Sequence, residues 1–225
     1  MIHAKPFLLI RHGETVMNAL KLTCGGGVDT ELNDTGWAQA ELAAKALFAL
    51  PVKPTLIINS GMRRTRETTS VLNRELGLPV LEDNDLREHM MGEWEQLPWA
   101  ESFPHLINDD KPKGGESTSE YAARVRSTLD KNLKAHASER ILFVAHGGTF
   151  HGMLRSYQYD RWEAFIPNAT LHAFEPEPKH EPMPWKITLH QWEKDTLLTS
   201  AAPICPSVPY TNTSRELEWR KSAGK

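Results

Sequence analysis

Two short apolar segments of the sequence have the pattern of buried strands. Residues 6–10 are apolar and stop at Arg11-His12-Gly13, and residues 141–145 are apolar and stop at His146-Gly147-Gly148. Continuous apolar runs of this length, bounded by turn residues, are typical of strands buried on both faces of a parallel sheet. Each run therefore predicts a strand that delivers a histidine at its carboxyl end.

Three segments have the periodicity and the terminal residues of helices, at residues 34–50, 60–76 and 117–137. Asn33 and Ser60 are favourable N-cap residues for the first two, and Ser117 with Glu120 predicts a capping box for the third. Shorter elements are predicted as strands at 55–58, near 80, at 169–174 and at 185–192, and as a helix at 150–157.

The alternation of strands and helices over the first 175 residues predicts an α/β fold, a three-layer α/β/α sandwich with a mostly parallel central sheet. Two parts of the chain lack this periodicity. Residues 82–115 carry Trp94, Trp99 and Phe103 and predict a long ordered loop, of a kind that is often functional. The polar residues from 203 onward predict a weakly structured tail.

Composition and charge narrow the functional classes. The chain has 225 residues, 40% of them apolar, which is enough for a well-buried core. Its 26 basic and 29 acidic side chains give a net charge of -3, so no overall field favours nucleic acid or an anionic membrane, and an anionic substrate needs a local basic cluster. No apolar run is long enough for a signal sequence or a membrane span, and we expect a cytoplasmic protein.

The two cysteines, Cys24 and Cys205, are far apart and stand in no metal-binding spacing. We therefore expect neither a zinc site nor a disulfide framework.

The two strand-end histidines are the first candidates for chemistry. In open α/β sheets ligands bind beyond the carboxyl ends of the strands, where His12 and His146 are both expected. The flanking glycines let backbone N–H groups approach an anion, and a helix that begins after His146 would add its positive end. A single histidine is more often structural, and the glycines alone indicate only tight turns; the shared strand-end position favours a functional reading.

Two further groups suit phosphoryl chemistry. Arg63, Arg64 and Arg66 lie near the start of a predicted helix. Cations there interact unfavourably with the helix dipole, so their presence indicates another role. A guanidinium fork is the preferred partner of a phosphoryl group. Glu88, at the entry of the long loop, is placed to supply a proton, although from loop position alone it would more often be a surface carboxylate.

Taken together, these motifs resemble the phosphoglycerate-mutase-like histidine phosphatase superfamily from about residue 7 to residue 174. Residues 11–13 match its RHG signature, and residues 60–68 are similar to its SxLxRAxQT pattern with three departures, at Met62, Thr65 and Glu67. Residues 86–95 resemble LxExxxGxWE, residues 115–117 match GES, and residues 144–149 resemble the second-histidine motif. The resemblance selects Arg64 rather than Arg63 as the phosphate ligand and Glu88 as the proton donor.

The resemblance implies a mechanism without metal or cofactor. His12 attacks phosphorus and becomes a phosphohistidine, while Arg11, Arg64 and His146 hold the phosphoryl oxygens. Glu88 protonates the leaving oxygen and then activates water. Residues expected near the phosphate or the leaving group are Asn18, Thr23, Cys24, Gly25 and Gly147, with Glu116 orienting the histidines from behind.

Departures from the family's mutases favour the phosphatase branch. Glu88 is followed by His89-Met90-Met91-Gly92, where mutases have Arg-His-Tyr-Gly, and residues 93–113 contain no arginine. We expect a phosphatase for a small phosphomonoester, with a cofactor-dependent phosphoglycerate mutase and a non-catalytic phospho-ligand binding module as alternatives. The leaving group and the oligomeric state stay open.

The resemblance also divides the chain into a phosphatase core, residues 1–175, and a C-terminal extension, residues 176–225, made of an added strand at 185–192 and an irregular tail. Trp94, Trp99 and Phe103 are expected either to form a lid over the leaving group or to pack as a cover on the core.

Overall fold

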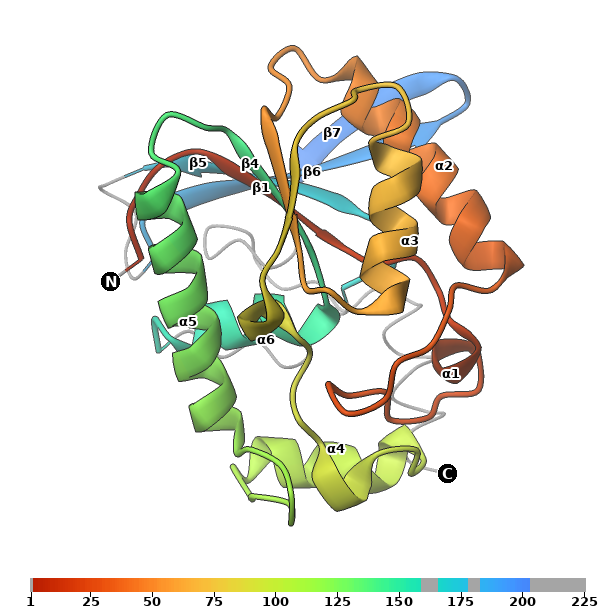
Figure 1. Ribbon diagram of the computed structural model, residues 1–225, viewed down its shortest axis with the longest axis vertical. Coiled ribbons are helices and arrows are strands. Elements are labelled where there is room, and N and C mark those ends of the chain that lie inside the picture. Colours follow the sequence, from red (N-terminus) through yellow and green to blue (C-terminus); the bar gives the residue numbers. More distant parts are fainter. Residues whose placement is uncertain (1, 159–165, 178–182, 203–225) are drawn as a thin grey trace.

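The computed structural model describes residues 2–158, 166–177 and 183–202, arranged around one seven-stranded sheet (Figure 1). The strands lie in the order β3-β2-β4-β1-β5-β6-β7. Those in the parallel half are β1 (Phe7–Arg11), β2 (Leu56–Asn59), β3 (Val80–Glu82) and β4 (Ile141–Ala145). The antiparallel half comprises β5 (Leu171–Pro176), β6 (Trp185–Glu193) and β7 (Thr196–Ala201).

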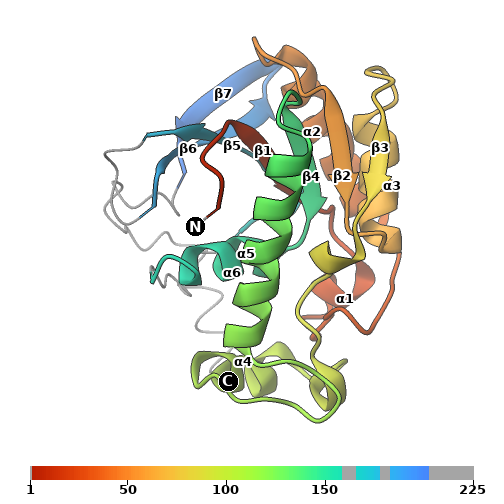
Figure 2. The same cartoon turned by 60° about the vertical axis from the view of Figure 1, so that its left-hand side comes forward.

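Helices cover both faces of the sheet, which confirms the predicted three-layer α/β fold (Figures 1 and 2). On one face lie α2 (Asp34–Ala49) and α3 (Arg63–Leu72), and on the other α5 (Thr118–Ala135) and α6 (Gly147–Arg155). Strand β1 serves both layers because its side chains alternate: Phe7 and Leu9 pack towards α5 and α6, and Leu8 and Ile10 towards α2 and α3. The remaining helical segments lie beside these layers: α1 (Val16–Ala19), η1 (Asn84–Leu86), η2 (Gly92–Trp94) and α4 (Trp99–Ile107).

The strand expected at 185–192 is present as β6 and continues the same sheet. Its first residue, Trp185, is fully buried and contacts Phe7 edge-on, with ring centroids 5.8 Å apart. Strand β7 was not predicted. The β6–β7 hairpin turns at Lys194 and Asp195, both with positive φ, instead of the Asn-Gly pair that signals such a turn in a sequence.

Several boundaries differ from the sequence prediction. Ser60 does not cap α3; the helix begins at Arg63 with Met62 as N-cap, because the Ser60 side chain is used inside the protein. The segment expected as a loop contains helix α4, which Pro104 in its interior concealed. Helix α6 starts at Gly147, and the sequence prediction placed its start near 150. The prediction was late because Gly147 and Gly148 have low helix propensity.

The caps expected from Asn33 and from the Ser117–Glu120 box are confirmed at α2 and α5. The tail expected from residue 203 lies outside the described residues. In the part of the chain that the structure describes, no helix has the length and apolarity needed to cross a membrane.

Candidate active site

The two strand-end histidines meet at the carboxyl edge of the sheet. Strands β1 and β4 are neighbours, and their register sets Arg11 opposite Ala145, so that His12 and His146 follow at the same level. The His12 backbone N–H donates to the Ala145 carbonyl at 3.0 Å, and the two imidazole centroids are 5.3 Å apart. Both histidines are buried.

His12 is held as a neutral imidazole with one free nitrogen. Its Nδ1 lies 2.7 Å from the Gly13 carbonyl oxygen, which can only accept, so Nδ1 carries the proton and Nε2 keeps its lone pair. Burial lowers the pKa of His12 well below its ordinary value, and the charges of Arg64 and Arg11 lower it further. At neutral pH the side chain is therefore an uncharged imidazole, with a lone pair on Nε2 that is available for a chemical role.

Arg64 reaches the histidines from the first turn of α3 and is fully buried. Its guanidinium donates to the carbonyls of Val28 at 2.9 Å and Gly25 at 3.1 Å, and its Nε donates to His146 Nδ1 at 3.3 Å. Arg63, by contrast, points outward and pairs with the carboxylates of Glu31 and Glu67. The structure thus brings Arg64, and not Arg63, to the histidines.

His146 uses both ring nitrogens within the protein. Because Nδ1 accepts from Arg64, Nε2 carries the proton and donates to the Ser60 hydroxyl at 2.8 Å. Burial, followed by the charge of Arg64, lowers the pKa of His146 well below its ordinary value. His146 is therefore uncharged at neutral pH. To contact a phosphoryl oxygen, it would have to give up its hydrogen bond to Arg64 or the one to Ser60.

Arg11 provides an unsatisfied donor. Its Nη1 donates to the Ile166 carbonyl at 2.6 Å, whereas its buried Nε has no acceptor within the described residues. Burial lowers the pKa of Arg11 to about 10, so the guanidinium still carries its charge at neutral pH. A buried N–H without an acceptor is costly, and a bound oxyanion would satisfy it. Gly147 lies beside this group, where a Cβ would be 3.5 Å from Arg11 Nε.

Glu88 enters the same region from the loop after η1. Its Oε1 accepts the His89 backbone N–H at 2.9 Å and the Tyr121 hydroxyl at 2.8 Å, and its Oε2 accepts the Gly148 N–H at 3.1 Å. A Cβ at position 148 would overlap Glu88 Oε1, so any larger residue than glycine there would displace the carboxyl group. The acid is thereby fixed to the turn that follows His146.

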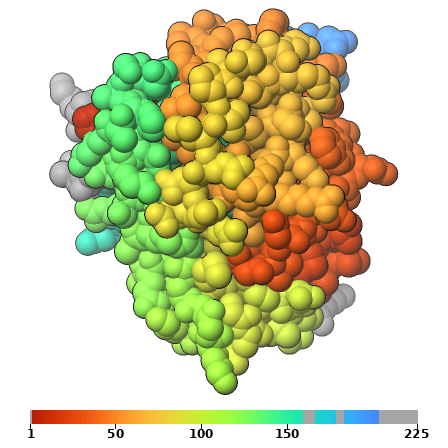
Figure 3. All heavy atoms as spheres, in the orientation of Figure 1, coloured from red at the N-terminus to blue at the C-terminus, as the bar shows by residue number. Residues whose placement is uncertain are grey.

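The loop of residues 23–27 packs against the Glu88 segment. On the surface, the red part of the chain near this loop lies against the yellow part that contains Glu88 (Figure 3). The Gly25 carbonyl accepts from Arg64, and Gly26 N–H donates to the His89 carbonyl at 2.8 Å. The thiol of Cys24 is half-buried, and burial raises its pKa. The Thr23 hydroxyl is instead fully buried and bonds Ser102 of α4 at 2.6 Å, so its observed role is to anchor the loop.

Asn18 and Glu116 are both held by protein groups. Asn18 Oδ1 accepts from Asn168 Nδ2 at 3.3 Å, and the same Nδ2 donates to the His12 carbonyl at 3.0 Å. The Glu116 carboxylate pairs with Arg124 and accepts the Met90 N–H at 3.0 Å. These hydrogen bonds hold the loop that carries Glu88, and the role of Glu116 in orienting the histidines stays a prediction.

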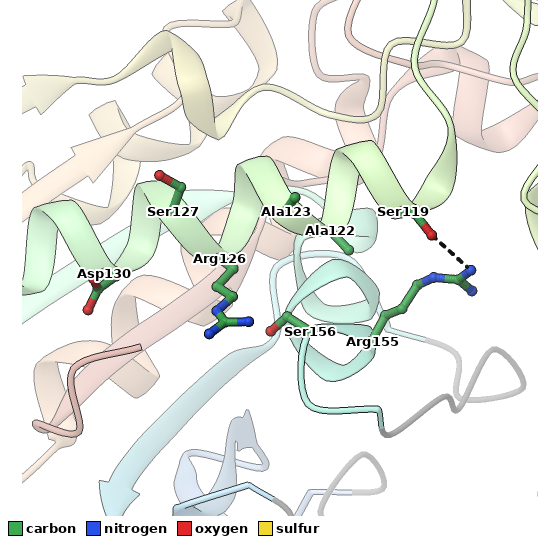
Figure 4. A pocket seen from close by; sticks show the side chains of 8 residues that line it. All are labelled: Ser119, Ala122, Ala123, Arg126, Ser127, Asp130, Arg155 and Ser156. Carbon is green, nitrogen blue, oxygen red and sulfur yellow. Dashed lines mark hydrogen bonds between the residues drawn. The ribbon is translucent and has the colours of Figure 1, made fainter. Parts of the chain in front are cut away.

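A separate surface groove lies between α5 and α6 (Figure 4). Its lining includes Arg126, Arg155 and the serines 119, 127 and 156, and Arg155 bonds Ser119 and approaches Asp109. None of the five predicted catalytic residues lines this groove. Among the described residues, no group of three or more His, Cys, Asp or Glu side chains is arranged to hold a metal ion.

Comparisons with known proteins agree with this geometry. The sequence profile of the histidine phosphatase superfamily (branch 1) matches residues 7–187. The chain belongs to this superfamily. It is 32% identical over 146 residues to an uncharacterized phosphatase, PhoE, of Bacillus subtilis, covering 65% of this chain and 74% of that protein. It is 34% identical over 149 residues to the probable phosphoglycerate mutase GpmB of Yersinia enterocolitica, covering 62% and 68%.

A mycobacterial glucosyl-3-phosphoglycerate phosphatase shares the fold of this histidine phosphatase. The two structures have a TM-score of 0.65 at 27% identity, over 84% of this chain and 99% of that one. The resemblance inferred from the motifs is thus confirmed, and the protein is an enzyme of the hydrolase class.

Three contacts that shape the site in this histidine phosphatase were not predictable from the sequence, although Ser60 itself was expected as a helix cap and opens the motif at residues 60–68. Tyr121 contacts Glu88 from within α5, Ser60 accepts from His146, and Arg124 donates to the carbonyls of Asp85, Arg87 and Glu88. Each lies far along the chain from its partner. Only the tertiary fold reveals such a contact.

The aromatic residues considered for a lid are half-buried. Trp94 stacks on His105 of α4 at 4.6 Å between ring centroids, and Trp99 contacts Phe103 within α4 at 5.4 Å. These contacts favour a packing role for α4 against its neighbouring loops.

Proposed function

We propose that this histidine phosphatase hydrolyses a small phosphomonoester without a metal ion, through a phosphohistidine on His12. The observation that carries the proposal is the state of His12, a neutral imidazole whose Nδ1–H is committed to Gly13, whose Nε2 bonds none of the described residues, and whose neighbours are the buried Arg64 and the half-buried Arg11. A neutral nucleophile surrounded by fixed cations suits attack on an anionic phosphoryl group.

In the first step, the Nε2 lone pair of His12 forms a bond to phosphorus while the bond from phosphorus to the leaving oxygen breaks. Arg64 and Arg11 stabilise the equatorial oxygens, and the unsatisfied Arg11 Nε gains an acceptor. His146 can exchange a contact with Arg64 or Ser60 for a phosphoryl oxygen. Glu88, protonated when substrate binds, gives its proton to the leaving oxygen.

In the second step, Glu88 acts as a base. Its carboxylate takes a proton from water, the water oxygen bonds to phosphorus, and the bond between phosphorus and His12 Nε2 breaks. Inorganic phosphate leaves and the neutral histidine is restored. Hydrolysis therefore needs one carboxyl group that alternates between acid and base.

Hydrolysis is favoured over mutase chemistry by the segment after Glu88. The His89 ring is committed to the protein, because it stacks on Tyr121 and its Nε2 contacts the Glu116 carbonyl at 2.7 Å. Residues 93–113 offer no arginine to grip a second anionic group. Of the two named relatives, one is a phosphatase and one a probable mutase, so a mutase assay belongs in the test.

The test is phosphate release from a panel of phosphomonoesters in the presence of a chelator, with acid-quench detection of phosphoenzyme. We expect turnover by the natural protein and none by His12→Ala. His190→Ala, which changes a histidine on β6, should behave as the natural protein. Turnover that the chelator abolishes would refute metal independence, and bisphosphoglycerate-dependent exchange of phosphoglycerates without phosphate release would establish the mutase.

A further inference from the structure

Tyr121 supplies the one side-chain hydrogen bond to the Glu88 carboxylate among the residues that the structure describes. The other two donors are the backbone N–H groups of His89 and Gly148. The Tyr121 hydroxyl lies 2.8 Å from Glu88 Oε1 and 3.5 Å from the hydroxyl of Thr149, which accepts the His146 backbone N–H. A single phenol thus links the acid to the turn that carries the second histidine.

The Tyr121 ring is held firmly. It is buried, lies parallel to the His89 imidazole with centroids 4.9 Å apart, and has the Arg124 guanidinium 4.9 Å from its centroid. Burial raises the pKa of Tyr121 well above its ordinary value, and the charge of Glu88 raises it further. The phenol therefore keeps its proton and remains a donor throughout the neutral range.

The hydrogen bonds divide the two carboxyl oxygens of Glu88 into different roles. A carboxylate has about four lone-pair positions, two on each oxygen. Tyr121 and the His89 N–H occupy those of Oε1, whereas the Gly148 N–H occupies only one of Oε2. One position on Oε2 is left for a proton.

We propose that Tyr121 is a positioning residue that reserves Glu88 Oε1, so that Oε2 is the atom that gives and takes the catalytic proton. The proposal rests on the proposed function of Glu88. The proton passes from Oε2 to the leaving oxygen as the phosphohistidine forms, and returns from water to Oε2 as it is hydrolysed. Without the phenol, the proton can occupy either oxygen and the carboxyl can turn.

The decisive variant is Tyr121→Phe, which keeps the ring and removes only the hydroxyl. We expect kcat to fall by about tenfold, the size of one hydrogen bond to a charged group. The hydroxyl that this variant lacks stabilises the Glu88 carboxylate. The pH–rate profile of Tyr121→Phe should therefore move to higher pH by about 1 unit relative to the natural protein. The inhibition constant of inorganic phosphate should stay unchanged, since the arginines are untouched. A 3-fluorotyrosine at this position, a stronger donor, should move the profile to lower pH.

Tyr157→Phe is the matched control, because Tyr157 also loses a hydroxyl bond, to the Ile2 N–H, in another part of the core. An unchanged kcat and pH profile in folded Tyr121→Phe would overturn the proposal, and so would an equal loss in Tyr157→Phe. A carbon-13 NMR titration of Glu88, assigned with Glu88→Gln, tests the contact without turnover. If the natural protein hydrolyses no phosphomonoester, the proposed function fails, while an NMR titration unaltered by Tyr121→Phe sinks the positioning role by itself.

Discussion

Replacing Gly148 with alanine adds one methyl group beside the proposed acid and changes no charge. The new Cβ would overlap Glu88 Oε1 and lie 3.0 Å from both Glu88 Cδ and Tyr121 Cε1, whereas ordinary contact begins near 3.4 Å. The backbone of α6 holds the methyl group in place, so the carboxyl must retreat. A displacement of about 1 Å costs on the order of 10²-fold in rate, and complete loss of the acid costs up to about 10⁴-fold.

The assay compares two substrates that differ in their need for a proton. We expect Gly148→Ala to lose about 10²-fold in kcat/KM on an alkyl phosphate, and less on p-nitrophenyl phosphate, whose leaving group departs without an acid. Gly152→Ala is the control, because the nearest atoms to its Cβ belong to Val125, at 3.1 Å, and Ala122, at 3.5 Å, both on helix α5. Equal losses on both substrates, or full activity of a folded Gly148→Ala protein on the alkyl phosphate, would refute the reasoning.

Three further predictions concern binding and stability. Arg64→Lys should lower kcat/KM by about 10²-fold or more in phosphate-release assays, because lysine cannot reproduce a buried guanidinium fork, whereas exposed Arg63→Lys should change it little. Thr23→Val should lower the free energy of unfolding by about 1 kcal/mol in urea titrations, with KM unchanged, because it removes the buried bond to Ser102, whose hydroxyl keeps the Trp99 carbonyl as a partner. Burial lowers the pKa of His172 to about 4, so between about pH 6.5 and 4 the unfolded chain takes up a proton here and the folded chain does not. The free energy of unfolding should therefore fall by about 2 kcal/mol from this residue between pH 7 and 5. His172→Gln should remove that part of the pH dependence of stability.

The part of the site that could be predicted lies where the sheet fixes it. A continuous apolar strand that ends in a histidine places that histidine by register alone, as Arg11 opposite Ala145 shows. The helix starts at α2 and α5 were predictable for a similar reason, since a cap is a contact within four residues. Local rules suffice wherever partners are near in sequence or paired along a strand.

The part that could not be predicted depends on contacts between distant segments. Serine is a favourable helix N-cap residue, yet the Ser60 hydroxyl accepts a hydrogen bond from His146, 86 positions away in the sequence. Thr23 lies in a loop that contacts Arg64, the proposed phosphate ligand, but its side chain turns towards α4. Both hydroxyls are buried and therefore need a hydrogen-bond partner. Which partner lies within hydrogen-bond distance is set by the tertiary structure and not by the local sequence.

The electrostatics of the site explain how a chain of net charge -3 can attract an anion. Burial keeps both histidines neutral, so the positive charge beside them comes from arginines, of which Arg64 and Arg11 act on both histidines. A charged His12 would lose its nucleophilic lone pair and would repel those arginines. In the proposed mechanism the field of the arginines therefore has two effects: it favours binding of a phosphoryl group, and it keeps His12, the proposed nucleophile, neutral.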